Sequence, residues 1–382
     1  MIRVLGIDLL HVMDSWLQSE STTRRINEIW SDISVPSVKK RCSISWHLMM
    51  TLSDLYGDLM HQKYNMQSFF STFQKYIKPE DIIVLAVSGW VDSMVLLDLV
   101  TWAHPHENII VAHFDHSLRG IESDGDRELV ANICKYKNIA FEVKKIDIGS
   151  MARDEKMNLE AIARRERYAF LETIRMQYGA RYILTAHHAV DQTETVIGNM
   201  IKWAKVRWLS GMSLISGSVF RPLLSVSKNE IRNYTKERNI DYREDSSNND
   251  TTYDRNRIRQ DIIPVLESLN PSIHNTIWEL AEYMQDVSVF LTGQVESWFQ
   301  IAEWESGKPN TFLIATFIAL APFFQGEIIS YLYARAQDGS TQWLSRGLID
   351  ELIRFISDPG SYGKKEIKNL YLERRGERIF IL

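Results

Sequence analysis

The sequence predicts an α/β protein with a doubly wound parallel sheet, followed by a smaller, mostly helical domain. Between residues 81 and 203, short apolar runs alternate with segments of helical periodicity, which is the pattern of βαβ units. The first run, 82–87, is apolar throughout, as expected for a buried strand. From Pro271 onward the apolar spacing is mostly helical.

Each predicted element has a local signal. Strands are expected at 82–88, 109–114, 141–146 and 182–186, and helices near 91–102, 123–136, 159–178, 192–203 and 228–238. Later in the chain, apolar-rich helical segments are expected at 277–291 and 311–334, and a terminal hairpin is expected to turn at Arg375-Gly376. Ligands of a parallel sheet bind at the carboxyl ends of its strands, so candidate site residues are expected just after the strands.

Composition and charge limit the class of protein. At 382 residues the chain is long enough for two or three domains, and its 24% charged and 45% hydrophobic residues are typical of soluble globular proteins. No apolar run is long enough to span a membrane, and the N-terminus lacks a signal-peptide pattern, so we expect a cytoplasmic protein with no membrane partner. Cys42 and Cys134 are too few and too far apart for a disulfide framework, a Cys-ligated zinc site or a cluster.

Three segments of the chain differ in pattern. Residues 1–65 show no motif and no sustained period, so they are expected to be an extension that is either disordered or not translated, with Met66 as a candidate start. The alternating segment, 66–250, is expected to form the catalytic domain. Residues 251–382 are expected to form the helical domain, after a polar loop at 242–250.

The stretch 81–98 predicts a strand, a tight turn at Ser88-Gly89 and a helix. Such a turn aims free backbone N–H groups and the positive end of a helix dipole at one point, which suits a phosphate. The alternative is a βα junction without a ligand, and the turn alone does not distinguish the two. Trp90 complicates the phosphate interpretation, because its side chain stands where backbone must approach the anion and because it is denied the φ values open to glycine.

Polar residues follow the second and fourth predicted strands, which favours one shared crevice. They are Asp115, His116, Arg119, His187, His188, Asp191 and Glu194. Asp191 and Glu194 share one face of a helix start, where they can hold a cation, an amine or Mg²⁺; the alternative is capping, with Asp191 as the N-cap and Glu194 as its partner. His187 and His188 lack a third ligand at zinc spacing, which favours hydrogen bonding, packing or nucleotide contact over a metal site.

Two arginine-rich segments are candidates for contact with phosphate, although the net charge of −5 does not itself indicate nucleic-acid binding. The arginines of 255–259 are too dense to share one solvated face, so at least one is expected to point into the protein or at a ligand. The helix at 158–178 carries Arg164, Arg165 and Arg167 beside Tyr168 and Phe170. There, a buried aromatic stripe with a basic outer face explains the pattern as well as RNA contact does.

Seven motifs follow one another along 66–382. They are SGWVDS at Ser88, HFDHSLRGIESDGD at His113, HHAVDQTET at His187, WLSGM at Trp208, RPLLSVSKNEI at Arg221, REDSSNND at Arg243 and RNRIR at Arg255. Each motif alone is weak. Their order and spacing together resemble the tRNA(Ile)-lysidine synthetases, and the end of the chain resembles the short form of that family.

The resemblance implies an N-type ATP pyrophosphatase domain of the PP-loop superfamily, with an adenine nucleotide alpha hydrolase-like fold, followed by a helical tRNA-binding domain. The family uses ATP, with Mg²⁺, to adenylate the C2 oxygen of the wobble cytidine in the isoleucine tRNA with a CAU anticodon. Free L-lysine then displaces AMP, and the lysidine formed changes decoding from AUG to AUA. The expected partners are that tRNA and L-lysine, and the oligomeric state stays open, a homodimer included.

The resemblance also implies roles for individual residues. The pyrophosphate portion of ATP would be held by Ser88, Gly89, Trp90, Val91, Asp92 and Ser93, with Asp92 near the metal or the reacting phosphate. Arg119 would neutralise developing charge, and Asp191 and Glu194 would bind the ammonium of lysine. Contacts with nucleotide or tRNA would come from His116, His187, Arg255, Arg257 and Arg259. No metal site made of protein ligands alone is implied.

The chain departs from the family at several positions. Trp90, Trp203 and Trp208 stand where the family has glycine, and Val190 stands where it has aspartate. One hypothesis is that UGA codons, which some bacteria read as glycine, are written here as tryptophan. The 18 glycines, roughly 5% of the chain against about 7% in average proteins, agree with this hypothesis. The competing hypotheses are a catalytically inactive tRNA-binding relative and another ATP pyrophosphatase acting on tRNA.

Overall fold

The computed structural model describes residues 3–4, 7–8, 66–117, 121–155, 158–202, 206–243, 254–307, 310–336 and 344–382. The chain divides into two compact units, 1–65 and 66–382. In the first unit, the two-residue strands β1 (Arg3–Val4) and β2 (Ile7–Asp8) pair antiparallel. The rest of that unit, on which the prediction of a disordered or untranslated extension falls, lies outside the described residues. Within the described part of the chain, no helix has the length and apolar character needed to span a membrane.

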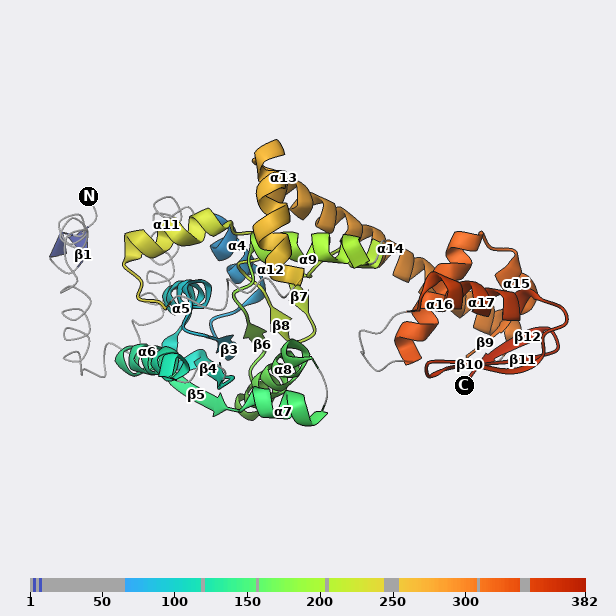
Figure 1. The fold of residues 1–382 in the computed structure, drawn as a ribbon, viewed down its shortest axis with the longest axis horizontal. Coiled ribbons are helices and arrows are strands. Elements are labelled where there is room, and N and C mark those ends of the chain that lie inside the picture. Colours follow the sequence, from blue (N-terminus) through green and yellow to red (C-terminus); the bar gives the residue numbers. More distant parts are fainter. Residues whose placement is uncertain are drawn as a thin grey trace. The chain divides into compact units, whose positions relative to one another are not determined.

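The second unit is built on a six-stranded sheet with the strand order β5-β4-β3-β6-β8-β7 (Figure 1). Its strands are β3 (Ile83–Ala86), β4 (Ile109–Asp115), β5 (Ala140–Lys145), β6 (Tyr182–Leu184), β7 (Ile215–Ser216) and β8 (Val219–Phe220). All neighbouring strands are parallel except β7 and β8. The predicted parallel sheet is therefore confirmed, and β7 and β8 have no counterpart in the sequence prediction.

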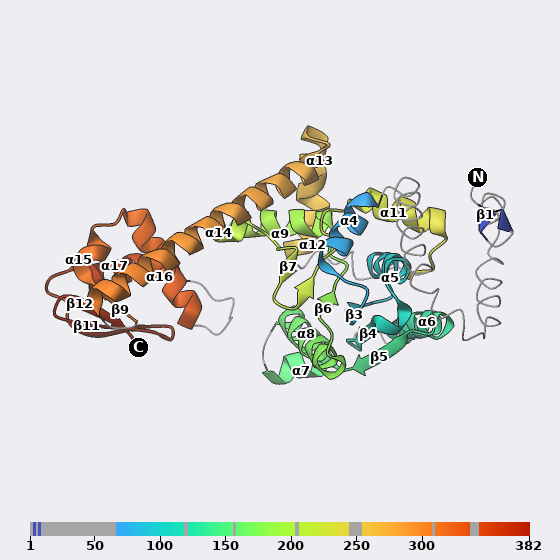
Figure 2. The same cartoon turned by 180° about the vertical axis from the view of Figure 1, so that it is seen from behind.

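Helices cover both faces of this sheet, as a doubly wound fold requires. They are α4 (Gln67–Tyr76), α5 (Val91–Ala103), α6 (Ile121–Lys137), α7 (Ile148–Glu155), α8 (Leu159–Tyr178) and α11 (Lys228–Arg238). On one face, α7 and α8 pack on alternate strand side chains, among them Val84, Ile110 and Phe114. Figures 1 and 2 show α4, α5 and α11 on the opposite side of the strands. Because both faces are covered, the central strand β3 is apolar along its whole length, whereas the edge strand β5 carries Glu142, Lys144 and Lys145.

The order of the strands creates a switch point between β3 and β6. The chain leaves β3 and builds β4 and β5 on one side, then crosses back to place β6 and β8 on the other side. Loops that leave two such neighbouring strands in opposite directions open a crevice at their carboxyl ends, and ligands of open α/β sheets bind there. The turn at 88–93 follows β3, and the motif at 187–194 follows β6.

The turn after β3 depends on one glycine. Gly89 has φ +93°, and a Cβ built on it would lie 3.3 Å from the Cβ and the backbone oxygen of Asp126. Trp90 has φ −87° and ψ 161°, which is extended backbone open to any L-residue. The expectation that the backbone at position 90 needs φ values open only to glycine is therefore wrong. The turn requires glycine at position 89, and at position 90 only the side chain of Trp90 can interfere with a phosphate.

Ser93 closes this turn by hydrogen bonds. Its hydroxyl donates to the Trp90 carbonyl at 2.9 Å and accepts the Ser88 N–H at 3.1 Å. The N–H of Met94 also donates to the Trp90 carbonyl, which begins α5. These bonds fix the first turn of α5 against the end of β3, so the free N–H groups of the helix start lie at the switch point.

The later part of this unit is mostly helical. Its helices are α9 (Ala189–Lys202), α10 (Val206–Leu209), α12 (Asp254–Arg257), α13 (Ile263–Leu269), α14 (Ile273–Ser306), α15 (Ile314–Ile318), α16 (Pro322–Ala336) and α17 (Arg346–Ser357), with a π-helical turn at Ile258–Ile262. The long helix α14 packs against α9 and α10 and also contacts α16. Figure 2 shows α15, α16 and α17 gathered around one end of α14. The predicted helical region is therefore present.

This region also contains an antiparallel sheet with the order β10-β11-β12-β9. Its strands are β9 (Thr311–Leu313), β10 (Gly363–Ile367), β11 (Leu370–Arg375) and β12 (Arg378–Ile381). The prediction of a helix from residue 311 is wrong at its start, because Phe312 pairs with Ile379 and so joins the sheet. The terminal hairpin is confirmed, with Arg375 opposite Arg378 and the turn one residue later than predicted. The predicted domain boundary after residue 250 lies outside the described residues and stays a prediction.

We expect Gly89→Ala to destabilise the protein by about 1–3 kcal/mol, because alanine must adopt a positive φ there and its methyl group crowds Asp126. Gly293→Ala is the matched control: it lies within α14, nothing lies within 4 Å of its added Cβ, and it should stabilise by about 0.5–1 kcal/mol. Urea unfolding followed by circular dichroism measures both. Equal effects of the two substitutions would contradict the strained turn.

Candidate active site

The turn after β3 places Asp92 in the first turn of α5, where two cationic or proton-donating groups meet its carboxylate. Oδ1 of Asp92 forms an ion pair with Nζ of Lys228 and lies 3.6 Å from Nε2 of His188. Burial alone would raise the pKa of Asp92, but His188 and Lys228 outweigh it and lower the pKa to about 2. Asp92 is therefore ionised at neutral pH.

Lys228 reaches this position because of the way α11 begins. Ser227 caps the helix by accepting the N–H of Glu230, and the Glu230 carboxylate accepts the N–H of Ser227 in return. This capping box fixes Lys228 as the first helical residue, and α11 packs against α5. The segment SKNE carries the capping-box signal in the sequence, but nothing local connects Lys228 with Asp92, which is 136 residues away.

His188 links the two loops of the switch point. Its Nε2 lies 3.6 Å from Oδ2 of Asp191 as well as 3.6 Å from Oδ1 of Asp92. Its Nδ1 accepts the N–H of Val190 at 3.2 Å, so the ring N–H is the one at Nε2, between the two carboxylates. The carboxylate that follows β6 and the one that follows β3 therefore share one imidazole.

The capping interpretation of Asp191 and Glu194 is wrong in its details. Helix α9 begins at Ala189, so Asp191 lies in the first turn instead of preceding the helix. Its Oδ2 accepts the N–H of His188 at 2.9 Å, which is the reciprocal role that the third residue of a helix plays in a capping box. Glu194 makes no part of this cap and faces the arginines of α12 and the π-helical turn.

Asp191 and Glu194 form a carboxylate pair that holds two arginines of the chain. Arg255 donates from a terminal nitrogen to Oδ1 of Asp191 and from Nε to Oε2 of Glu194, both at 2.6 Å. Arg259 donates from Nε to Oε1 of Glu194 at 2.5 Å. Burial would raise the pKa of Asp191, but His188 and Arg255 outweigh it and the net shift is downward. The pair is thus a built site for cationic groups.

The remaining predicted residues lie elsewhere. Arg257 is exposed and pairs with Asp261 at 3.8 Å, so it points away from the carboxylate pair. His116 packs edge-on against Phe114, with ring centroids 4.8 Å apart. Arg119 and Trp203 lie outside the described residues. The structure therefore brings Asp92, Asp191, Glu194, Arg255 and Arg259 together around His188 and leaves Arg257 and His116 outside that group.

His187 lies behind the carboxylate pair. Its Nδ1 is 2.8 Å from the hydroxyl of Thr185. Burial lowers the pKa of His187 to about 3; Asp191 opposes this shift, whereas the positive charges of Arg221 and Arg167 reinforce it. The imidazole is neutral at neutral pH and cannot serve as a cationic partner for phosphate.

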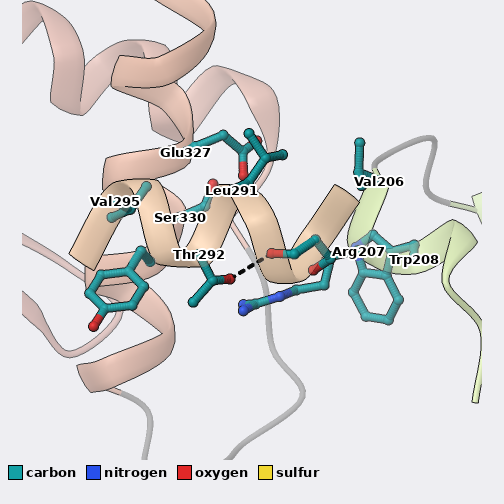
Figure 3. Close-up of a pocket in the computed structure, with 10 residues that line it drawn as sticks. Val206, Arg207, Trp208, Leu291, Thr292, Val295, Glu327 and Ser330 are labelled. Atoms are coloured by element: carbon teal, nitrogen blue, oxygen red, sulfur yellow. Dashed lines mark hydrogen bonds between the residues drawn. The ribbon is translucent and has the colours of Figure 1, made fainter. Parts of the chain in front are cut away.

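A separate shallow pocket lies between α10, α14 and α16 (Figure 3). Arg207 extends along α14 toward Thr292, whose hydroxyl donates to the Ser288 carbonyl at 2.8 Å, and Trp208 lies on the α10 side. The backbone of Trp208 is helical, so this position, like position 90, does not demand glycine for its conformation. None of the site residues around His188 lines this pocket.

Comparison with known proteins places this geometry in a family. A family model described as a PP-loop domain matches residues 60–266, more than half of the chain. Two curated relatives are named tRNA(Ile)-lysidine synthase. One, from Bacillus anthracis, is 34% identical over 73% of this chain and 60% of the relative; the other, from Geobacter sulfurreducens, is 35% identical over 59% and 49%. The chain thus spans about half to two thirds of the length of the curated relatives it matches.

A solved structure has the same fold. The U34-tRNA thiolase NcsA from Methanococcus maripaludis superposes with a TM-score of 0.51 and 16% identity, over 59% of this chain and 80% of that one. At this identity the likeness concerns the fold alone. Together with the turn at the end of β3 and the match over 60–266, it leads to one conclusion: the chain belongs to the PP-loop domain family.

Proposed function

We propose that this protein is an ATP-dependent ligase that joins lysine to C2 of the wobble cytidine in the isoleucine tRNA with a CAU anticodon. The observation that carries the proposal is the convergence of Asp92 and Asp191 on His188 at the switch point, between the turn after β3 and the carboxylate pair. The names of the relatives support the reaction. The free lysine, the tRNA and ATP are all part of the proposal.

The reaction needs two displacement steps. The C2 oxygen of cytidine attacks the α-phosphate of ATP, and pyrophosphate leaves. The neutral ε-amine of lysine then attacks C2, AMP leaves with the former C2 oxygen, and the amine loses a proton. The first step needs stabilisation of negative charge on the leaving pyrophosphate, which the N–H groups at the start of α5 and the ammonium of Lys228 can provide.

Mg²⁺ belongs to this proposal as a companion of ATP. Within the described ranges, no group of three or more His, Cys, Asp or Glu side chains can hold a metal ion by itself. Mg²⁺ is commonly held by one or two carboxylates together with substrate phosphates. Asp92, an ionised carboxylate beside the turn, fits that requirement. When bound, the ion would neutralise phosphate charge, while Asp92 would orient it from the protein side.

Asp191 and Glu194 suit the α-ammonium of lysine better than its ε-amine. The attacking ε-amine must be neutral, and a pair of carboxylates would raise its pKa and hold it protonated. In this structure Arg255 and Arg259 occupy the same oxygens. The α-ammonium must therefore take over part of these hydrogen bonds, and the arginines must shift within the crevice when lysine binds.

Lysidine formation tests the proposal directly. The purified chain, a transcript of the isoleucine tRNA with the CAU anticodon, ATP, Mg²⁺ and radiolabelled lysine should give labelled tRNA, and nuclease digestion followed by mass spectrometry should place lysine on the wobble cytidine. Asp92→Asn should lower the rate by about 10²-fold, because an amide cannot supply the charge that organises the phosphates. Absence of labelled tRNA from the chain both as written and with glycine at positions 90, 203 and 208 would refute the proposal.

We expect Asp191 and Glu194 to contribute to the binding of lysine and not to the binding of ATP. We expect Asp191→Asn and Glu194→Gln to raise KM for lysine by about 10-fold or more, because each removes a charge-assisted hydrogen bond to the ammonium. The tRNA-dependent exchange of pyrophosphate into ATP, which needs no lysine, should stay within about threefold of the parent chain. Asp261→Asn, on the exposed carboxylate paired with Arg257, is the control that should change neither quantity. Equal losses in exchange and in lysine KM would contradict this assignment.

Trp90 provides the test of the recoding hypothesis. If a glycine is written here as tryptophan, Trp90→Gly should raise tRNA-dependent pyrophosphate exchange by at least about tenfold, because it removes a side chain from the turn that must approach phosphate. The triple change at positions 90, 203 and 208 should raise it further. An inactive relative would show no exchange in any of these variants. TGA at codon 90 in the gene would give independent support.

A further inference from the structure

A second charged cluster lies near the candidate active site and has no role in the mechanism above. Its members are Arg164, Arg167 and Tyr168 on α8, and Arg221 directly after β8. The guanidinium carbons of Arg164 and Arg167 lie 4.8 and 5.3 Å from the centroid of the Tyr168 ring. Arg164 and Arg221 are near enough for the charge of one to lower the pKa of the other. We call these four residues the arginine cluster.

The arginine cluster lies beside the crevice. The charges of Arg167 and Arg221 both act on the ring of His187, which follows β6 and precedes the carboxylate pair. The cluster also runs from the surface inward, because Arg164 is exposed whereas Arg221 is only 6% exposed. A ligand group that approaches from the surface therefore meets Arg164 first.

The arginine cluster has an excess of positive charge. In the parts of the chain that the structure describes, none of its three guanidiniums forms an ion pair with a carboxylate, whereas the neighbouring Arg165 pairs with Glu155 at 2.7 Å. Burial lowers the pKa of Arg167 and of Arg221; Tyr168 opposes this shift, and the charge of Arg164 reinforces it. Like charges held close together without a carboxylate repel one another, so the cluster favours the binding of an anion.

Polar atoms of the arginine cluster also lack partners. The buried Nε of Arg221 and the buried hydroxyl of Tyr168 make no hydrogen bond to any described residue. One terminal nitrogen of Arg221 donates to the Ser213 carbonyl at 2.8 Å, which anchors the guanidinium. Tyr168 stacks with Arg164 and Arg167, and it also acts on Arg221 by raising its pKa. Guanidinium forks and a hydroxyl are the donors that best match the oxygens of a phosphate.

We propose that the arginine cluster is a binding site for one phosphate group at the edge of the active-site crevice. The phosphate has two candidate sources, a phosphodiester of the tRNA and a phosphate of ATP, and the choice of these two rests on the proposed function. The site would complement the turn at 88–93, which lies on the β3 side of the switch point, by holding negative charge on the β6 side.

Binding measurements on the chain as written test this site without relying on catalysis. The affinity for fluorescently labelled tRNA is measured by anisotropy at several KCl concentrations, and the affinity for ATP by titration calorimetry. The variants are Arg164→Gln, Arg167→Gln, Arg221→Gln and Tyr168→Phe. Arg165→Gln is the matched control on the same helix, because its guanidinium is already paired with Glu155. Arg167→Lys retains the charge and should recover part of the affinity.

Each arginine-to-glutamine variant should weaken binding of the phosphate source by about tenfold, and Tyr168→Phe by a few-fold. If the source is tRNA, the slope of log affinity against log salt should fall by about 0.7 for each lost contact, and ATP affinity should not change. If the source is ATP, its affinity should fall and the tRNA salt slope should not. Arg165→Gln should change neither. Unchanged affinity for both ligands in Arg164→Gln and Arg167→Gln, with unchanged thermal unfolding, would overturn the proposal.

Two controls separate this proposal from the proposed function. Arg221 is buried, so thermal unfolding of Arg221→Gln shows whether a loss of binding reflects a loss of fold. If that variant unfolds, Arg164→Gln at an exposed position and the isosteric Tyr168→Phe test the site in its place. Lysidine formation with unchanged binding in these variants would refute the phosphate site alone. Weakened binding in a protein that forms no lysidine would refute the reaction and leave the site standing.

Discussion

The position of His188 between two carboxylates constrains the whole candidate site. Asp92 and Asp191 come from opposite sides of the switch point, and both lie 3.6 Å from Nε2 of one imidazole. The N–H of Val190 fixes the tautomer, so this nitrogen carries the proton. Two ionised carboxylates that face the same imidazole would otherwise repel each other. The imidazole between them, together with Lys228 on one side and Arg255 on the other, offsets this repulsion.

The fold was largely accessible from the sequence because its signals are local. Strands such as β3 are continuous apolar runs, and α8 is bounded by Asn158 at its start and by Gly179, in a left-handed conformation, at its end. The start of the predicted helix at 311 failed for the opposite reason. Its apolar residues satisfy a helical period, and only pairing with β12, far along the chain, makes 311–313 a strand.

The candidate site could be predicted only in part, because the sequence shows which residue types lie in a segment but not which distant residues they contact. The sequence shows the paired carboxylates at 191 and 194 and the dense arginines of 255–259 as separate patterns. The carboxylates bind the arginines only because α12 packs against α9 in the fold. Lys228 lies 136 residues from Asp92, and the capping box at the start of α11 predicts a helix there but not a contact with Asp92. The backbone at Trp90 was misjudged because a family glycine suggests a positive φ, whereas the chain places that demand on Gly89.

The distribution of charge suggests an order of events for the proposed reaction. Arg255, Arg259 and the arginine cluster lie on the β6 side of the switch point, and Asp191 and Glu194 neutralise only Arg255 and Arg259. The local field therefore favours polyanions such as ATP and tRNA and opposes a free cationic amino acid. Once phosphate groups compensate the remaining arginines, Arg255 and Arg259 can turn toward them and release oxygens of Asp191 and Glu194. Lysine would then meet an available carboxylate pair only after the polyanions are in place, which matches a chemistry in which adenylation must precede attack by the amine.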